Sequence, residues 1–419
     1  MKFKDYNLDD KVKKGLEELG FKRPTDIQYK SIFNIQDGED LLAIAHTGTG
    51  KTAAFAIPII DKIFFIKNGQ RRYSGVQALV MVPTHELALQ IESVFHDIGK
   101  YTSVKTISII GGVDQAPQIE ALTKGEVDIV IATPGRMFDL ISQGHLQTHR
   151  IEILVLDEAD HMLDLGFKDD IIDILHKLPK RRQTLFFSAT INDHIKKTAY
   201  KIVKQGAIRI QLSTKDPVAK NIDHFVLFVD MDHKRFFLER VINENPGQKI
   251  LAFVRTKVRA ERVSKAMTRA EIPSLTIHGD KSQEDRISVL QQFREGEVNL
   301  LIGTDVTARG IDIPDISIVI NYDLPDEPEN YVHRVGRTGR GKRKGHAYSF
   351  CAPEEEDVLN TIQEFLEKEI KVLTVDDDDY HDTLQVERDR THDYMSLMKE
   401  MQEEEESKKK SYKWKKKKK

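Results

Sequence analysis

The chain has 419 residues, of which 64 are Lys or Arg and 67 are Asp or Glu, for a formal net charge of −3. This length predicts two or three domains with cores of their own, and 39% apolar residues exclude a fully disordered chain. The single cysteine, Cys351, excludes an intramolecular disulfide and a thiolate zinc site, and it indicates a reducing compartment, which we take to be the cytoplasm.

The N-terminal residues, MKFKDYNLDDKVKK, contain no apolar stretch and do not resemble a signal peptide. The most apolar segment, residues 53–66, is interrupted by Pro58, Asp61 and Lys62. It is therefore too short and too charged to span a bilayer, and we expect no membrane association.

Short apolar runs without polar alternation recur along the chain, as is typical of strands that are buried on both faces of a sheet. In the first half they lie at residues 41–45, 78–82, 106–110, 128–132, 153–157 and 184–188. In the second half they lie at residues 224–229, 249–254, 275–279, 299–303 and 316–321. Their spacing of about 20–30 residues leaves room for crossover helices and predicts parallel α/β sheets.

Because the series of runs occurs twice, we expect two α/β domains, residues 1–212 and 224–373. Residues 213–223 contain Pro217 and no apolar periodicity, so they are interpreted as a linker.

The C-terminal region differs in composition from the two domains. Residues 374–407 form an acidic extension with 13 acidic and three basic residues, and residues 408–419 form a tail with nine lysines and no acid. Residues 1–373 therefore carry only −2. We expect the extension to be partly helical or disordered and the tail to be disordered. The aromatic residues among its lysines suit non-specific RNA contact, although a solubilising end is the alternative.

Residues 45–52, AHTGTGKT, follow a predicted strand and precede an Ala-rich helical segment, which is the context of a phosphate-binding loop. Gly48 and Gly50 would let backbone N–H groups close around phosphate oxygens at a helix N-terminus. Lys51 would neutralise the β- and γ-phosphates, and the Thr52 hydroxyl would hold Mg²⁺. The alternative is a Gly-rich turn with a chance GKT, and both flanking segments argue against it.

ILVLDEAD, residues 153–160, is a second candidate phosphate-chemistry motif. A buried strand delivers Asp157 and Glu158 to its carboxyl end, where ligands bind in open α/β sheets. Asp157 would coordinate Mg²⁺, partly through water, and Glu158 would polarise the attacking water. A solvated acidic loop is the alternative, and a phosphate loop about 105 residues upstream argues against it.

Two further segments are weaker signals on their own. In GFKRPTDIQ, residues 20–28, the Gln28 amide could pair with adenine N6 and N7, and Phe21 could stack on the base. The alternative is a helix start with a surface glutamine. YVHRVGRTGR, residues 331–340, offers three arginines for phosphoryl charge, with a solvated basic loop as the alternative.

Taken together, AHTGTGKT, DEAD, SAT (188–190) and HRVGRTGR, in this order and spacing, resemble a DEAD-box RNA helicase over residues 3 to 373. Phe3 with GFKRPTDIQ resembles the adenine-reading motif of that family. The strings that resemble its RNA-contacting motifs are PTHEL (83–87), Gly111-Gly112, TPGR (133–136), AFVRT (252–256), QEDR (283–286) and TDVTARGID (304–312).

The resemblance implies two tandem RecA-like domains with a flexible charged tail, and the site residues that follow. Catalysis is implied for Lys51, Asp157, Glu158, Arg337 and Arg340. Contacts to ATP are implied for Phe3, Phe21, Gln28, Thr47, Gly48, Thr49, Gly50, Lys51, Thr52, Gly310 and Asp312. Mg²⁺ would be held by Thr52 and Asp157, partly through water. RNA contacts are implied for Pro83, Thr84, Gly112, Thr133, Arg136, Arg255, Gln283, Arg286, Thr304 and Asp305. Coupling of the two sites is implied for Asp160, Ser188, Thr190 and His333, the last of which could instead be only structural.

The implied activity is RNA-stimulated ATP hydrolysis with local unwinding of short duplexes or remodelling of ribonucleoproteins. The alternatives are an ATP-gated RNA clamp with slow turnover and a DNA-directed motor. RNA would be contacted mainly through its backbone by a monomer, with RNA-processing or ribosome-assembly proteins as partners. The short core and basic tail look most like the RhlE-type bacterial group. PTHEL departs from the family in having His85 where arginine is usual, and a neutral histidine cannot hold phosphate as a permanent charge can.

Overall fold

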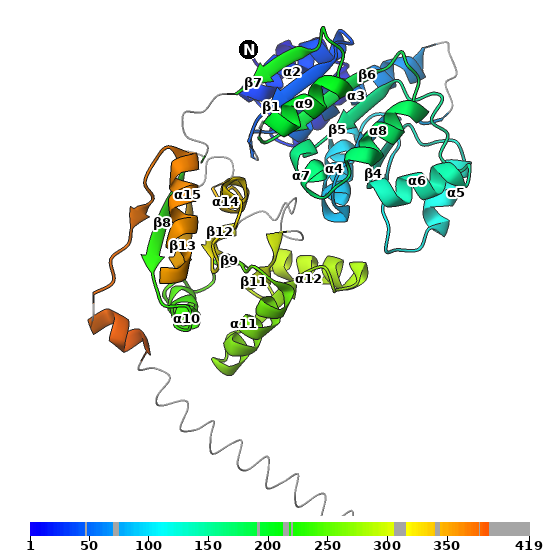
Figure 1. Ribbon diagram of the computed structural model, residues 1–419. Coiled ribbons are helices and arrows are strands. Elements are labelled where there is room, and N and C mark those ends of the chain that lie inside the picture. Colours follow the sequence, from blue (N-terminus) through cyan, green and yellow to red (C-terminus); the bar gives the residue numbers. More distant parts are fainter. Residues whose placement is uncertain are drawn as a thin grey trace, which may run out of the picture.

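The computed structural model describes residues 1–46, 48–69, 75–190, 193–212, 218, 221–305, 316–339, 344–376 and 378–384. These residues form two seven-stranded sheets in which the paired strands run parallel, each covered by helices on both faces (Figure 1). The prediction of two parallel α/β sheets is confirmed. The Lys-rich tail and most of the predicted linker lie outside the described residues.

The first domain has the strand order β3-β4-β2-β5-β6-β1-β7. Its strands are β1 (Leu41–Ile44), β2 (Ala78–Met81), β3 (Thr106–Ile109), β4 (Ile129–Ala132), β5 (Ile153–Leu156), β6 (Gln183–Ser188) and β7 (Ile208–Gln211). Its helices are η1 (Phe3–Asp5), α1 (Asp10–Glu18), α2 (Asp26–Gln36), α3 (Lys51–Asn68), α4 (His85–Gly99), α5 (Ala116–Thr123), α6 (Pro134–Ser142), α7 (Ala159–Asp164), α8 (Lys168–Lys177) and α9 (Asp193–Ile202).

Alternate residues of each central strand enter different cores, because successive side chains of a strand point to opposite faces. In β1, Leu41 and Ala43 pack with α1–α4, while Leu42 and Ile44 pack on the other face with α5–α9. All four residues are buried, which is why the strand reads as an unbroken apolar run.

The second domain has the strand order β10-β11-β9-β12-β13-β8-β14. Its strands are β8 (Ile222–Phe228), β9 (Lys249–Phe253), β10 (Ser274–Ile277), β11 (Leu300–Gly303), β12 (Ile316–Asn321), β13 (Gly345–Cys351) and β14 (Lys371–Val372). Helices α10 (Lys234–Glu244) and α11 (Lys257–Arg269) pack on one face. The other face is covered by α12 (Gln283–Glu295), α14 (Pro328–Val335) and α15 (Glu356–Leu366), and the short η2 (Pro353–Glu355) precedes α15.

Three strands were not predicted from the sequence. β7 and β14 lie at sheet edges, where exposed polar residues interrupt the apolar run. β13 is central, but its sequence GHAYSFC carries Gly345, His346 and Ser349, which hide the pattern of a buried strand. The missed strands therefore share a weak apolar signal.

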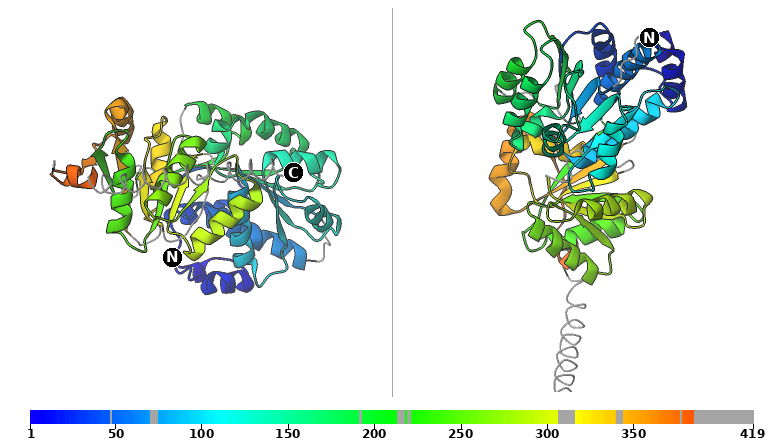
Figure 2. Two further views of the ribbon diagram at one scale, coloured as in Figure 1. Left: turned by 90° about the horizontal axis from the view of Figure 1, so that it is seen from below. Right: turned by 90° about the vertical axis from the view of Figure 1, so that its right-hand side faces the viewer.

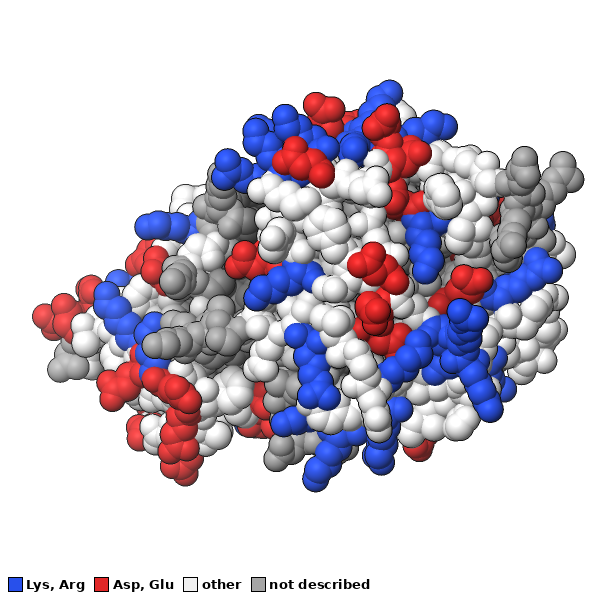
Figure 3. Space-filling view, turned by 90° about the horizontal axis from the view of Figure 1, so that it is seen from above, with Lys and Arg blue, Asp and Glu red and all other residues white. Residues whose placement is uncertain are grey.

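The two domains face each other along one side (Figure 2). Acidic and basic side chains are interspersed on the face seen in Figure 3, in keeping with the small net charge of residues 1–373. None of the described helices has the length and apolar character that crossing a membrane requires.

The start of the acidic extension is docked on the second domain. Residues 378–384 are helical and lie against α10, where the Tyr380 hydroxyl is 3.0 Å from His233 Nδ1. The Arg240 side chain donates to Thr383 Oγ1 at 3.0 Å and pairs with Asp379. Only this first part of residues 374–407 is described.

Candidate active site between the two domains

The phosphate-loop candidate joins β1 to α3, and its backbone geometry requires glycine. Gly48 and Gly50 have φ values of +80° and +91°, which side chains other than glycine rarely adopt. A Cβ atom on Gly50 would lie 2.5 Å from Gln28 Nε2. The Thr49 hydroxyl closes the loop by donating to the His46 carbonyl at 2.7 Å. The loop thus places the N-terminus of α3 beside the carboxyl end of β1.

Lys51, the first residue of α3, is the central cation of this loop. Its side chain is buried, with 7% exposed, and its Nζ atom has no hydrogen-bond partner among the described residues. A buried ammonium group without a partner is costly, and a phosphate at the helix N-terminus would supply the missing acceptor. The residues present therefore fit a nucleotide phosphate.

The predicted adenine-reading segment is bonded to this loop. Gln28 Oε1 accepts from the Thr25 backbone N–H at 2.9 Å, and Gln28 Nε2 donates to the Gly50 carbonyl at 3.2 Å. Phe21 is half-buried and meets the ring of buried Phe3 edge-on, with the centroids 5.7 Å apart. The structure thus gives Gln28 a positioning contact, and its reading of adenine stays a prediction.

The DEAD segment follows β5 and holds a non-glycine residue in a left-handed conformation. Glu158 has φ +48° and begins α7, a strained backbone of the kind that collects at functional sites. The Asp157 carboxylate accepts from the Glu158 backbone N–H at 2.9 Å. Burial raises the pKa of Asp157 to about 6, against the opposing charge of Lys51. Both carboxylates are therefore held at the carboxyl end of β5.

Glu158 is kept ionised despite its burial. Burial alone would raise its pKa, but the hydrogen bond from His161 and the charge of Arg337 lower the pKa below its ordinary value. His161 Nδ1 lies 3.4 Å from Glu158 Oε2. A permanent carboxylate at this position is suited to polarise a water molecule.

The described residues contain no group of three or more His, Cys, Asp or Glu side chains that could hold a metal ion. Asp157 and Thr52 still offer oxygen ligands of the kind that Mg²⁺ takes, and Mg²⁺ ordinarily keeps several waters and binds substrate phosphates. These residues fit a magnesium ion bound with a nucleotide better than an all-protein metal cage.

Asp160 connects the DEAD segment to SAT and to the second domain. Its Oδ2 atom accepts from the backbone N–H of Ala189 at 3.0 Å, and from the backbone N–H and hydroxyl of Thr190 at 2.9 and 3.0 Å. Ser188 Oγ donates to the Thr190 carbonyl at 2.7 Å. His333 Nε2 of the second domain lies 3.9 Å from the same Oδ2 atom. Burial would raise the pKa of Asp160, but His333 and Lys51 lower it.

Arg337 is the described arginine of the second domain that reaches this site. It is buried, its Nε donates to the His333 carbonyl at 3.1 Å, and it lines a small cavity shared with the first domain. That cavity is also lined by Glu158, Asp160, His161, Ala189 and His333. Four of the predicted catalytic and coupling residues, Glu158, Asp160, His333 and Arg337, therefore line one cavity. Thr47, Gly310, Asp312 and Arg340 lie outside the described residues.

A second set of interdomain contacts joins α4 to α12. His85 Nδ1 lies 2.9 Å from Gln283 Oε1, and Gln283 Nε2 donates to Glu86 Oε1 at 3.3 Å. Arg286 pairs with the same Glu86 oxygen at 2.7 Å. His85 therefore contacts the second domain in this structure. Glu86 was missed from the sequence because an acid is not an expected phosphate ligand.

The remaining predicted RNA residues of the first domain lie at the start of helices or in loops. Thr84 Oγ1 accepts from the Leu87 N–H and begins α4, and Pro83 precedes it. Gly112 has φ +72° and faces Gln283, Thr133 is the residue before α6, and Arg136 donates to the Val113 carbonyl at 3.0 Å.

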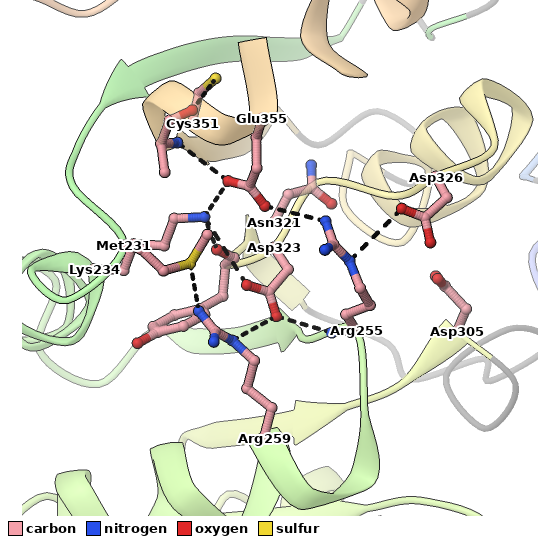
Figure 4. Close-up of polar contacts among 12 residues, drawn as sticks. Met231, Lys234, Arg255, Arg259, Asp305, Asn321, Asp323, Asp326, Cys351 and Glu355 are labelled. Atoms are coloured by element: carbon pink, nitrogen blue, oxygen red, sulfur yellow. Dashed lines mark hydrogen bonds and ion pairs between the residues drawn. The ribbon is translucent and has the colours of Figure 1, made fainter. Parts of the chain in front are cut away.

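In the second domain, a polar network holds Arg255, one of the predicted RNA residues, and Asp305 lies nearby (Figure 4). Arg255 contacts Glu355 at 3.3 Å and lies 3.6 Å from Asp326. Asp305, which follows Thr304 after β11, is bound by Arg334 through two contacts of 2.6 Å. Asp305 thus positions its loop, and direct contact with RNA stays a prediction for it.

The sequence prediction did not include the residues that support this network. Asp323 accepts from the Arg255 backbone N–H at 2.9 Å and pairs with Arg259 at 2.8 Å. Lys234, which is fully buried, donates to the Tyr322 carbonyl at 2.9 Å and to Glu355. The burial of Lys234 could not be predicted from nearby residues, because the sequence shows only a lysine at the start of an amphipathic helix.

Comparisons with known proteins agree with this geometry. The DEAD/DEAH box helicase family model matches residues 25–198, and the helicase conserved C-terminal domain model matches residues 233–342. The ATP-dependent RNA helicase CshA of Listeria monocytogenes is 40% identical over 372 residues, which cover 89% of this chain and 70% of that protein. CshA of Geobacillus kaustophilus is 40% identical over 361 residues, 86% of this chain and 76% of that protein. The RhlE-type subgroup finds no support in these CshA relatives and stays a prediction.

Solved structures give the same result. S. cerevisiae Dbp5 bound to RNA and ADP BeF3 superposes with a TM-score of 0.82 at 31% identity, over 92% of this chain and 99% of that chain. Mss116p bound to ssRNA and AMP-PNP gives a TM-score of 0.80 at 29% identity, over 90% of this chain and 80% of that chain. The fold is therefore that of two tandem RecA-like domains, and the chain belongs to the family of DEAD-box ATP-dependent RNA helicases.

Proposed function

We propose that this chain hydrolyses ATP when RNA is bound and uses the joining of its two domains to unpair short RNA duplexes locally. One observation carries the proposal. Glu158 of the first domain and Arg337 of the second line the same small cavity, and the charge of Arg337 lowers the pKa of Glu158. Two half-sites that complete each other only when the domains meet couple hydrolysis to domain closure.

The roles of the residues follow from charge and position. Lys51 would bind the β- and γ-phosphates, because its buried ammonium lacks an acceptor. Glu158 would accept a hydrogen bond from the attacking water and orient it. Arg337 would stabilise negative charge on the transferring phosphoryl group. Magnesium, held by Asp157 and Thr52 and partly through water, would supply further neutralisation of the phosphate charge.

Asp160 is the candidate link between the nucleotide and the domain interface. It holds the Thr190 backbone and hydroxyl, and it attracts His333 from the second domain. A loss of phosphate charge near Lys51 would alter the field at Asp160, because Lys51 contributes to its lowered pKa. The interface would then be sensitive to the state of the nucleotide.

RNA would lie across the loops that meet at the His85–Gln283 contact. The predicted RNA residues on both sides of it are loop and helix-start positions, which suit contacts to the sugar–phosphate backbone. Such contacts are tolerant of sequence and can select RNA through its 2′-hydroxyl groups. The single cysteine supports the cytoplasm as the compartment, and we propose a monomer as the working unit.

The test is the substitution Glu158→Gln. The control is Glu152→Gln, because Glu152 is exposed and directly precedes β5, the strand that leads to Glu158. We expect RNA-stimulated ATP hydrolysis to fall by about 100- to 10,000-fold, because a neutral amide cannot polarise the attacking water as a carboxylate can. ATP-dependent RNA binding should persist.

Substantial residual turnover in Glu158→Gln would show that another group activates the water. If the wild-type rate is instead slow and unchanged by RNA, the ATP-gated clamp becomes the better description. Equal stimulation by DNA would favour a DNA-directed motor.

A further inference from the structure

The second domain has a basic groove between α10 and α11, away from the residues assigned above to ATP. Its volume is about 580 Å³. Five cationic side chains line it, against one carboxylate: Arg235, Arg259, Arg262, Lys265 and Arg269, with Asp232. An excess of cations in a concave surface attracts a polyanion.

Three of these cations are available for a ligand. Arg262, Lys265 and Arg269 are exposed, and no hydrogen bond or ion pair is found for their side chains within the described part of the chain. Arg259 is different, since it is fixed by Asp323 at 2.8 Å and by the Met231 sulfur at 2.9 Å (Figure 4). The groove therefore has one arginine, Arg259, whose side chain is held in place, and three exposed cations that can contact a ligand.

The spacing of the charges suits an extended strand. Arg259, Arg262 and Arg269 lie on one side of α11, because they are three and seven residues apart on a helix with 3.6 residues per turn. At 1.5 Å per residue the row is about 15 Å long. A linear row of cations is matched by the regularly spaced phosphates of a nucleic-acid strand.

The groove is also continuous with the predicted RNA surface. α11 begins immediately after AFVRT, whose Arg255 is a predicted RNA contact. The Asp323 carboxylate binds both the Arg255 backbone N–H, at 2.9 Å, and the Arg259 side chain. Asp323 thus contacts both Arg255, a predicted RNA contact, and Arg259, the first arginine of α11 that lines the groove.

We propose that this groove binds the phosphate backbone of single-stranded RNA that extends past the predicted RNA-contacting loops. The competing occupant is the acidic extension of the same chain. Its described residue Asp379 pairs with Arg240, which does not line the groove, so the observed acidic contact lies elsewhere. The inference rests on the proposed function, because RNA is the ligand in both.

The experiment compares two lengths of oligouridine on the full chain with a non-hydrolysable ATP analogue. One is short enough to span only the loops of the two domains, and the other extends well past α11. In Arg262→Gln/Lys265→Gln/Arg269→Gln, affinity for the long RNA should fall by about 10- to 100-fold, and the slope of log K against log salt should shrink by about 2. Affinity for the short RNA and the ATPase rate that it stimulates should not change.

The control is Lys177→Gln/Lys180→Gln/Arg181→Gln, which removes the same charge from exposed positions of the first domain. It should leave both affinities within about twofold, since these cations lie outside the groove. Equal losses for short and long RNA, or an unchanged long-RNA affinity, would overturn the proposal. A third outcome would also overturn it. If the groove variant binds RNA more tightly than the wild type, and this gain is lost when residues 385–419 are deleted, the acidic extension is the occupant of the groove. Absence of ATPase stimulation by the short RNA in the wild type would count against the proposed function and not against the groove.

Discussion

Among the described residues, each domain buries one lysine at the start of a helix, and the two lysines differ in their partners. Lys51 is 7% exposed and its Nζ atom has no hydrogen-bond partner within the described residues. Lys234 is 0% exposed, yet its ammonium group donates to Tyr322 and Glu355 and lies 3.9 Å from Asp323. The comparison distinguishes a buried ammonium group that has no hydrogen-bond partner among the described residues from one whose partners are two acceptors of its own domain.

The difference follows from what surrounds each helix start. Lys51 is the first residue of α3 and directly follows the glycine loop, and a helix N-terminus of this kind offers backbone N–H groups to an anion. Lys234 lies under η2, where Glu355 also accepts from the Ala352 backbone N–H at 3.1 Å. Burial lowers the pKa of Lys234, and the charge of Glu355 opposes that change.

For Lys51, the expected effect is on nucleotide binding. Lys51→Met should weaken ATP binding by about 10- to 100-fold, because a charge-assisted hydrogen bond to phosphate is lost. The free energy of unfolding should change little, since the cost of burying an ammonium group without a hydrogen-bond partner is removed while the attraction of Lys51 to Asp157 and Asp160 is lost. A nucleotide titration and a chemical denaturation curve measure the two effects. Marked destabilisation would show that Lys51 has a structural partner after all.

Lys234→Met should behave in the opposite way. It removes the buried cation of Glu355 and leaves that carboxylate with Arg255 alone, which is expected to cost up to about 3–5 kcal/mol of domain stability. Denaturation of the full chain should report this loss as an earlier transition, while ATP affinity at the first domain is retained. The double variant Lys234→Met/Glu355→Gln should recover part of the loss, because the unpaired carboxylate is gone. No recovery would mean that Lys234 acts through packing alone.

Cys351 offers a probe of the same network, because it lies beside Ala352 and Glu355 (Figure 4). Burial, with the nearby Glu355, raises the pKa of the Cys351 thiol to about 12. The unfolded thiol loses its proton first, so the free energy of unfolding should decline as pH rises from about 9 to about 12. At neutral pH, alkylation should require opening of the domain.

In Lys234→Met, alkylation of Cys351 should accelerate by about 100-fold or more, because the opening equilibrium shifts with stability. Lys51→Met should leave the alkylation rate unchanged and serves as the control. Rapid labelling of the native wild-type chain would contradict the buried position of the thiol. Mass spectrometry of the labelled chain gives the rate directly.

The smallest expected effect on ATP binding is at Gln28, which joins the predicted adenine-reading segment to the glycine loop that precedes Lys51. Gln28→Ala removes a hydrogen bond to the Gly50 carbonyl and should weaken ATP binding by about fivefold. It should also reduce the preference for ATP over GTP, as the adenine-reading prediction requires. A loss of affinity that is equal for both nucleotides would leave Gln28 as a positioning residue for the loop.

Much of the fold, and the placement of several candidate site residues, could be predicted because the signals are local. β1 and β5 are short apolar runs, and the residues that follow them, such as Lys51 and Asp157, are placed by strand–loop–helix geometry within a few residues. The edge strand β7 was missed because its alternation reflects exposure, which depends on neighbours far away in the sequence. Glu86, Asp323 and Glu355 were missed for a related reason, since each acts on residues of another element or domain.

The sequence by itself determined the two α/β domains, the glycine-dependent loop and the set of side chains able to bind phosphate. These depend on residue type and short spacing, which a linear chain shows directly. Only the tertiary structure decided which charges are paired. Lys51 and Lys234 are both lysines at the start of a helix, but whether a carboxylate meets the ammonium group depends on elements separated by as many as 121 residues. The same holds for His85, whose contact with Gln283 exists only because two separately folded domains meet.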